Sequence, residues 1–237
     1  MNFKRIAIAA ALGAAATSGT ALAELTGNVG VASQYMFRGL EQSGDAAVQG
    51  GLDYSAASGF YVGTWASTIN FSGVSSTGSG SEVDFYAGFA GEAGAIGYDV
   101  GAIYYWYSEE DEPAGASPSP SNNTVEIYAG VSAGPVGLKL YYSLEDYFAL
   151  TSKDVFYVVA NAGFPISEKL SFGASVGVTK ADEAIFNAST EKEYLDYSIG
   201  LTAAPADGFE MGLNLIGTDL DNDAPKVVLS GSYSFGL

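Results

Sequence analysis

The sequence predicts an all-β protein, a transmembrane up-and-down antiparallel β-barrel of about 12 strands. Three observations carry this prediction. Apolar and polar residues alternate with a period of two along most of the chain, the links between these segments are alternately short and long, and aromatic residues gather near both ends of the segments. Together they indicate a closed sheet with one face toward lipid and the other toward a polar interior.

The composition limits the chemistry that the chain can perform. Its 237 residues include 27 Asp and Glu against 9 Lys and Arg, for a formal net charge of -18, with no His and no Cys. Nucleic acid is excluded as a partner because binding phosphate requires a basic surface. Disulfides, Cys/His zinc sites and imidazole catalysis are excluded as well. A Ser171–Lys169 dyad on one strand is a weak signal, so we expect no enzyme activity, no cofactor and no metal site.

The N-terminus has the three parts of an export signal. Lys4 and Arg5 precede an apolar run over 6–16, and Ala21-Leu22-Ala23 has the small residues of a signal-peptidase site. The run is too short to span a bilayer as a helix, and no later segment is apolar enough to do so. We expect a signal peptide over 1–23 and a single barrel domain over 24–237. The alternative, a buried N-terminal helix, explains the cleavage pattern less well.

The alternation is clearest in 169–179, where Leu170, Phe172 and Val176 share a face opposite Ser171 and Ser175. Such a pattern gives each strand one apolar and one polar face. The segment 59–70 is ambiguous, because Tyr61, Trp65 and Ile69 oppose Phe60 and Val62. The predicted strands are 24–38, 46–55, 59–70, 82–92, 95–108, 123–133, 136–145, 153–164, 168–179, 193–203, 208–218 and 226–236.

The connections between these strands alternate in length. The short links, marked by Gly, Pro or small residues, are 56–58, 93–94, 134–135, 165–167 and 205–207. The long polar links are 39–45, 71–81, 109–122, 146–152, 180–192 and 219–225. This alternation places all long loops at one end of an up-and-down sheet, as in outer-membrane barrels.

Aromatic residues form two predicted belts, one at each membrane interface. At the long-loop end lie Tyr35, Phe37, Tyr104, Trp106, Tyr142, Tyr157 and Tyr197. At the short-turn end lie Tyr54, Phe60, Tyr98, Phe164, Phe172, Phe209 and Phe235. The alternative is a soluble sandwich or ligand-binding barrel with its apolar faces turned inward. That alternative fits poorly because Gly, Ser, Thr and Ala dominate the opposite face, where a solvated surface carries many Lys and Glu.

The start of the barrel domain carries a family resemblance. Residues 27–40 read GNVGVASQYMFRGL, 47–54 read AVQGGLDY and 58–67 read SGFYVGTWAS. These segments resemble the proteobacterial TorF-type porin family, whose members are described as conserved hypothetical proteins. The resemblance implies an outer-membrane barrel with a channel role and supplies no substrate and no catalytic residue. One departure is that Gly236 and Leu237 follow Phe235, whereas many barrel proteins end on an aromatic residue.

With the apolar faces toward lipid, the opposite faces line the lumen. The parity of the strands places Thr26, Asn28, Gln49, Glu82 and Lys169 inside. The candidate pore-lining or ligand-binding residues are Gln34, Arg38, Asp53, Asp84, Asp99, Glu126, Lys139, Asp196 and Glu210. Arg38 is the leading candidate, as the only Arg after residue 23, at the end of the first predicted strand. It could narrow a pore or contact an anionic solute, or it could brace the wall through a salt bridge.

The external loops are strongly acidic, with Glu109, Glu110, Asp111 and Glu112 in one of them. An acidic mouth favours cations over anions. The stretch 219–223 alternates oxygen ligands but lacks the Gly and the terminal Glu of the helical calcium loop.

We therefore expect an outer-membrane, porin-like channel for passive diffusion of small solutes or ions. The alternative is a non-conducting barrel that binds a ligand or partner through its loops or lumen. The expected partners are outer-membrane lipid, lipopolysaccharide, the barrel assembly machinery of a Gram-negative cell, and the solutes themselves.

Overall fold

A computed structural model describes residues 23–70, 79–108, 122–148, 150, 154–186 and 190–237. The predicted signal peptide therefore lies outside the described residues except for Ala23, and so does the acidic run from Glu109 to Glu112. Within the described ranges, no helix is long and apolar enough to cross a membrane.

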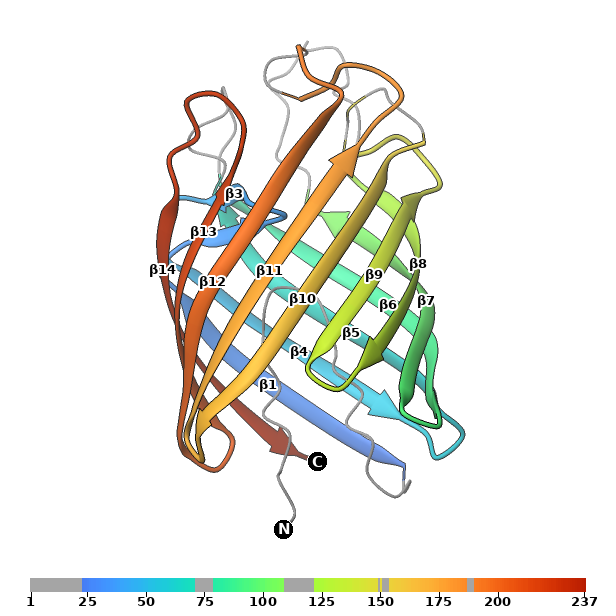
Figure 1. The fold of residues 1–237 in the computed structure, drawn as a ribbon, viewed down its shortest axis with the longest axis vertical. Helices are drawn as coiled ribbons and strands as arrows, with labels where there is room; N and C mark the ends of the chain where they lie inside the picture. The colour runs from blue at the N-terminus through green and yellow to red at the C-terminus, as the bar shows by residue number, and fades with distance from the viewer. Residues whose placement is uncertain (1–22, 71–78, 109–121, 149, 151–153, 187–189) are drawn as a thin grey trace.

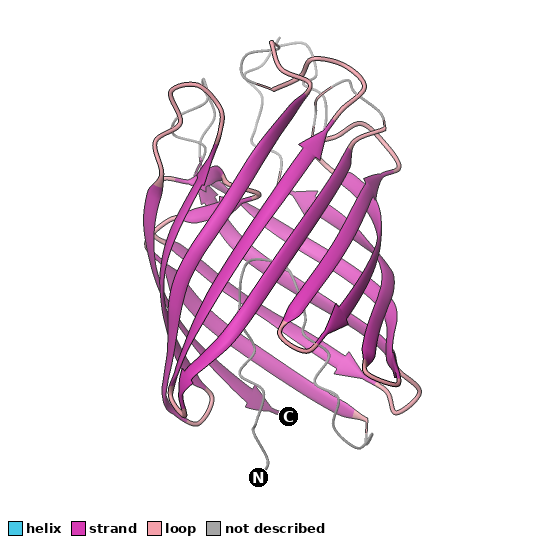
Figure 2. Ribbon diagram, in the orientation of Figure 1, coloured by secondary structure: helices cyan, strands magenta, loops and turns pink. Residues whose placement is uncertain are grey.

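The described chain forms one closed antiparallel β-barrel (Figures 1 and 2). Of the fourteen strands in the sheet, all but β2 and β3 form the barrel wall, which gives the twelve strands that the sequence predicts. Closure comes from pairing of β1 with β14 and of β5 with β6. The wall strands are β1 (Glu24–Ala32), β4 (Ala47–Ser55), β5 (Phe60–Asn70), β6 (Ser79–Ala93), β7 (Ile96–Tyr107), β8 (Thr124–Ala133), β9 (Val136–Ser143), β10 (Phe156–Ser167), β11 (Leu170–Lys180), β12 (Glu193–Ala206), β13 (Phe209–Thr218) and β14 (Lys226–Gly236).

The tight turns all lie at one end of the barrel, and the strand ends that the longer connections join lie at the other (Figure 1). Gly94 and Gly134, with φ of 66° and 56°, supply the left-handed backbone that such short hairpin turns require. β1 begins and β14 ends at the short-turn end, as the even number of strands requires. The predicted alternation of short and long links is confirmed.

The first predicted strand, 24–38, is wrong at its C-terminal end. β1 stops at Ala32, and the chain bends at Ser33 and Gln34 into a separate hairpin of β2 (Tyr35–Phe37) and β3 (Leu40–Ser43). Ser33 holds the bend, because its backbone N–H donates to the Leu229 carbonyl at 2.8 Å and its Oγ accepts from the Leu229 N–H at 3.0 Å. Arg38 and Gly39, with φ of 48° and 81°, form the turn.

The hairpin β2–β3 points into the barrel, which corrects the placement of two aromatic residues. Tyr35 and Phe37 are only 2% and 6% exposed and belong to a buried cluster, whereas the sequence predicts them in the outer belt. The bend at Ser33 and Gln34 interrupts the alternation, so the parity of β1 does not carry over to them. Tyr157, also predicted in the belt, is buried inside as well.

The outer surface of the wall is apolar, as predicted. Val29, Leu52, Val100, Leu213 and Leu229 are all exposed on it. The ambiguous segment in β5 is also resolved. There the chain alternates with Tyr61, Trp65 and Ile69 toward the interior and Phe60 and Val62 toward the outside.

Large side chains fit inside because glycines face them across neighbouring strands. Tyr61 pairs with Gly88, and Tyr86 pairs with Gly63. A Cβ at Gly63 would come within 2.5 Å of the Tyr86 ring, so only glycine lets this tyrosine lie flat against the wall. The same reciprocal arrangement at Gly88 explains why an aromatic-rich interior still closes into a narrow barrel.

An apolar exterior around a polar interior is the arrangement that lipid requires. We expect Leu213→Arg, which places a charge on the outer face of β13, to lower the free energy of unfolding in bilayers by about 2–4 kcal/mol. The neighbouring Asn214→Arg points inward and serves as the matched control. Urea unfolding in lipid vesicles measures both variants, and equal losses would contradict the assignment of the two faces.

Candidate functional site

The turn of the inward hairpin is fixed to the barrel wall by an ion pair. The two terminal nitrogens of Arg38 donate to the two carboxylate oxygens of Glu126 on β8, at 3.0 and 2.6 Å. Both side chains are almost fully buried, at 4% and 1% exposure. A bidentate guanidinium–carboxylate pair fixes orientation as well as distance, so the hairpin has a defined place in the lumen.

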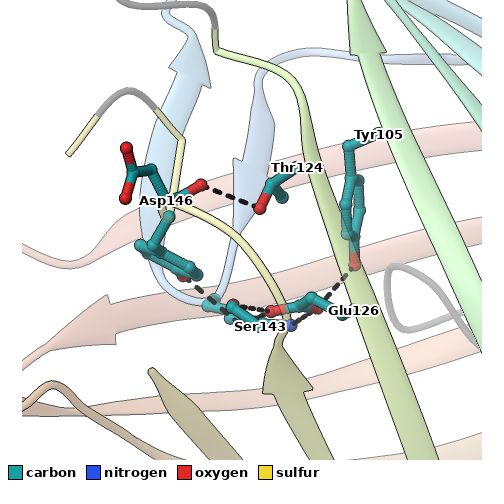
Figure 3. A network of polar contacts seen from close by, with 7 residues as sticks. Tyr105, Thr124, Glu126, Ser143 and Asp146 are labelled. Carbon is teal, nitrogen blue, oxygen red and sulfur yellow. Dashed lines mark hydrogen bonds and ion pairs between the residues drawn. The ribbon is translucent and has the colours of Figure 1, made fainter. Parts of the chain in front are cut away.

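The Glu126 carboxylate is the centre of a larger polar network (Figure 3). The Tyr105 hydroxyl and the Ser143 Oγ each donate to it at 3.1 Å. Arg38 also donates to the Tyr147 hydroxyl at 3.3 Å. Burial raises the pKa of Tyr147 to about 12 against the opposing effect of Arg38, so this loop residue stays neutral at physiological pH. Arg38, Tyr105 and Ser143 together donate hydrogen bonds to both carboxylate oxygens of Glu126, as a buried charge requires.

Aromatic rings enclose the Arg38 guanidinium. It lies 4.2 Å from the Tyr157 ring centroid, 4.8 Å from that of Phe37 and 5.0 Å from that of Tyr141. Such contacts stabilise a desolvated cation through the negative ring faces. Arg38 thus lies in a cage of aromatic rings. Both of its terminal nitrogens already donate hydrogen bonds, to Glu126 and to the Tyr147 hydroxyl.

A second contact holds the first strand of the hairpin. The Tyr35 hydroxyl donates to Glu82 on β6 at 3.0 Å, and its ring lies 5.4 Å from that of Trp65. Phe37 packs edge-on against Tyr105 and Phe148. The hairpin is therefore tied to β6 and β8 and packs against side chains of β5, of β7 and of the loop after β9.

A second polar layer spans β4 to β9. Lys139 donates to Asp99 at 2.7 Å and lies 4.0 Å from the Tyr128 ring centroid. The Tyr61 hydroxyl donates to Asp99, and Tyr86 donates to Asp53, both at 2.5 Å. The predicted lumen residues Asp53, Asp99 and Lys139 are thus neutralised or hydrogen-bonded by partners two strands away in the sheet.

The remaining predicted residues are dispersed. Asp196 on β12 accepts from Tyr157 at 3.1 Å, and Gln34 donates to Glu41 near the hairpin at 3.5 Å. Asp84 is fully buried on β6, and Glu210 faces inward on the opposite wall, on β13. The site therefore gathers Arg38 and Glu126 in one place and Asp99 and Lys139 in another, and leaves Glu210 apart.

The two halves of the lumen differ in size and chemistry. Tyrosines and charges line β5 to β10, whereas small residues predominate on β11 to β14 and β1, beside Tyr194, Asp196 and Glu210. The inward positions of that second half include Ser171, Ser175, Ser198, Gly200, Thr202, Gly212, Ser230, Ser232 and Gly30, as the strand register shows.

Sequence reasoning missed the inward tyrosines Tyr35, Tyr105, Tyr128 and Tyr141 as site residues. A signal was present for Tyr128 alone, which pairs with Gly101 on β7, where the absence of a Cβ makes room for the ring. Tyr105 pairs with Asp84 and Thr124, and Tyr141 with Tyr128 and Tyr157, so no glycine marked them. The hairpin itself had no comparable signal.

A comparison with protein families decides the relationship of the chain. The model of a family of bacterial proteins of unknown function, Gcw_chp, matches residues 14–234. The chain belongs to the Gcw_chp family. Among curated proteins, none matches the chain.

Solved structures give the fold relationship of this Gcw_chp protein. The KdgM porin in complex with disordered oligogalacturonate is 9% identical with a TM-score of 0.57, over 90% of this chain and 99% of that one. An outer-membrane channel from Pseudomonas putida is 9% identical with a TM-score of 0.53, over 96% and 100%. The NanC porin is 10% identical with a TM-score of 0.52, over 89% and 97%. The chain thus shares the barrel fold of outer-membrane channels.

The Arg38–Glu126 pair makes a stability prediction. Arg38→Ala leaves Glu126 buried without its cation, which we expect to cost about 3–5 kcal/mol of unfolding free energy. The double variant Arg38→Met/Glu126→Gln removes both charges at similar volume and should recover most of that loss. Urea unfolding of the protein in detergent micelles compares them. A double variant no more stable than Arg38→Ala would contradict the burial of the pair.

Proposed function

We propose that this Gcw_chp protein is an outer-membrane channel through which small solutes or ions diffuse passively. The observation that supports it best is a closed barrel with an apolar exterior and a polar interior lined by side chains from every wall strand. The fold relationship to outer-membrane channels and the resemblance to TorF-type porins support the same function. In this proposal the signal peptide over 1–23 directs export, and lipopolysaccharide and the assembly machinery are the envelope partners.

The lumen charge supports a preference for cations. Inward carboxylates on the described strands include Asp53, Glu82, Asp84, Asp99, Glu126, Asp196 and Glu210. The inward cations among the same candidates, Arg38 and Lys139, are both paired. A pore with excess negative charge raises the local concentration of cations and repels anions. A polyanionic oligosaccharide such as the one bound to KdgM therefore fits this lumen poorly, and neutral or cationic solutes fit better.

The inward hairpin sets the width of this channel. It is tied to β6 and β8 and fills the space beside the tyrosines of β5 to β10, so a path would run beside the small residues of β11 to β14 and β1. The same packing supports a second candidate function, a non-conducting barrel whose filled lumen and long loops bind a ligand or partner.

Planar-bilayer recording of the purified protein separates the two functions. A channel should give discrete conductance steps, and in a potassium chloride gradient the reversal potential should have the sign of cation preference. Well-folded protein that stays silent would support the binding barrel instead. A reversal potential of the opposite sign would contradict the acidic lumen as the selectivity element.

Arg38→Ala tests whether the hairpin narrows the pore. Without the ion pair the hairpin loses its anchor on β8 and the lumen loses a positive charge, so conductance and cation preference should both rise. Lys169→Ala is the matched control, because Lys169 is exposed and donates to the Pro205 carbonyl near the short turns. Single-channel currents equal to those of the unsubstituted protein would show that the hairpin does not limit flow.

A further inference from the structure

Two carboxylates lie side by side beneath the hairpin without a counter-ion. Glu82 and Asp84 are two residues apart on β6, so both point inward, and each is 0% exposed. One Glu82 oxygen accepts from Tyr35 of the hairpin. The other Glu82 oxygen and both Asp84 oxygens have no hydrogen-bond partner among the described residues.

The groups around this pair are known from the strand register. On β7, Tyr107 lies opposite Glu82 and Tyr105 lies opposite Asp84. On β5, Ser67 lies opposite Glu82 and Trp65 lies opposite Asp84. Tyr35 faces the pair from the hairpin. Glu126 on β8 is the next charged group, and Arg38 is bound to it. No described cation contacts either carboxylate.

Two adjacent ionised carboxylates shielded from water repel each other, and each loses its hydration. Either a cation or a proton must therefore neutralise the pair in part. A metal ion fits poorly: magnesium keeps several water ligands and calcium needs six to eight oxygens, whereas neither side chain touches solvent. No described group of three or more acidic residues could hold a metal. A proton needs no space and joins two carboxylates through one O–H···O hydrogen bond.

We propose that Glu82 and Asp84 share one proton at neutral pH and that this acid pair is a pH-sensitive latch for the inward hairpin. With the proton in place, the pair carries a single negative charge and Tyr35 stays hydrogen-bonded to Glu82. When pH rises the proton passes to bulk water and leaves two negative charges in a site closed to solvent. Hydrating them requires the hairpin that covers them to move away.

The latch is therefore closed at neutral pH and opens as pH rises. Its effect on conduction rests on the proposed channel function, whereas the shared proton and the movement of the hairpin do not.

Trp65 reports the position of the hairpin, because its ring packs against Tyr35. The chain has 2 Trp residues, and the other, Trp106, is exposed on the outer face. In a Trp106→Phe background, Trp65 emission is recorded in micelles from about pH 6 to about pH 10, a range that covers values found for buried carboxyl groups. We expect a reversible shift to longer wavelength as pH rises, with unchanged far-ultraviolet circular dichroism.

Glu82→Gln/Asp84→Asn in the same background has no proton to lose and should show no such shift. Glu210→Gln, an inward carboxylate on the opposite wall, is the matched control and should keep it. A shift that persists in the double variant, or emission that does not change with pH in the background protein, would overturn the latch.

Infrared spectroscopy detects the proton directly and does not depend on conduction. At pH 7 the protein should show a protonated-carboxyl carbonyl band that Glu82→Gln/Asp84→Asn lacks and Glu210→Gln retains. Absence of the band in the folded, unsubstituted protein would refute the shared proton, and so would a band that appears only after a chelator removes bound metal. A pH-dependent Trp65 signal in a protein silent in bilayers would leave the latch standing and refute the channel alone.

Discussion

Closure of the barrel is the constraint on which the rest of the structure depends. Because β1 pairs with β14 and β5 with β6, every second side chain of the wall enters one enclosed space. That space cannot hold bulky side chains on all sides. The chain meets this limit with tyrosines on one half of the wall, glycines opposite them, and small residues on the other half. The asymmetry leaves room for the hairpin inside the barrel.

The hairpin requires a second compensation, because it carries the buried guanidinium of Arg38. In a chain with a formal net charge of -18, carboxylates are abundant. Glu126 therefore pairs with Arg38, while hydroxyls of Tyr105 and Ser143 complete its hydrogen bonds. A buried pair of this kind adds little net stability compared with an apolar substitute, but its bidentate geometry fixes where the hairpin lies. The Glu82–Asp84 pair is the second place where burial and charge conflict, and it lies under the same hairpin.

The alternation of apolar and polar residues predicts the strands of the wall. It fails at the hairpin β2–β3 for a physical reason. Leu213 and Asn214 could be assigned to opposite faces because the period of two is unbroken along their strand. Tyr35 and Phe37 were misplaced because a two-residue bend at Ser33 and Gln34 resets the parity, and neither residue is a turn former as strong as Gly or Pro. Arg38 faces inward, as expected, and its ion pair with Glu126 is of the kind that braces a wall, whereas its role in narrowing a pore stays a prediction. Its partner could not be predicted, because Glu126 is distant in sequence and many carboxylates compete.

If the barrel is the proposed outer-membrane channel, water fills a lumen bounded by the inward side chains. The chain has no Cys, so a single introduced thiol reports its own surroundings. The most direct measurement compares Ser198→Cys, which points inward on β12, with Ile199→Cys, which points outward, using a small charged thiol reagent on outer membranes. We expect rapid modification at position 198 and protection at 199. Protection at both positions, or modification at 199 alone, would contradict it.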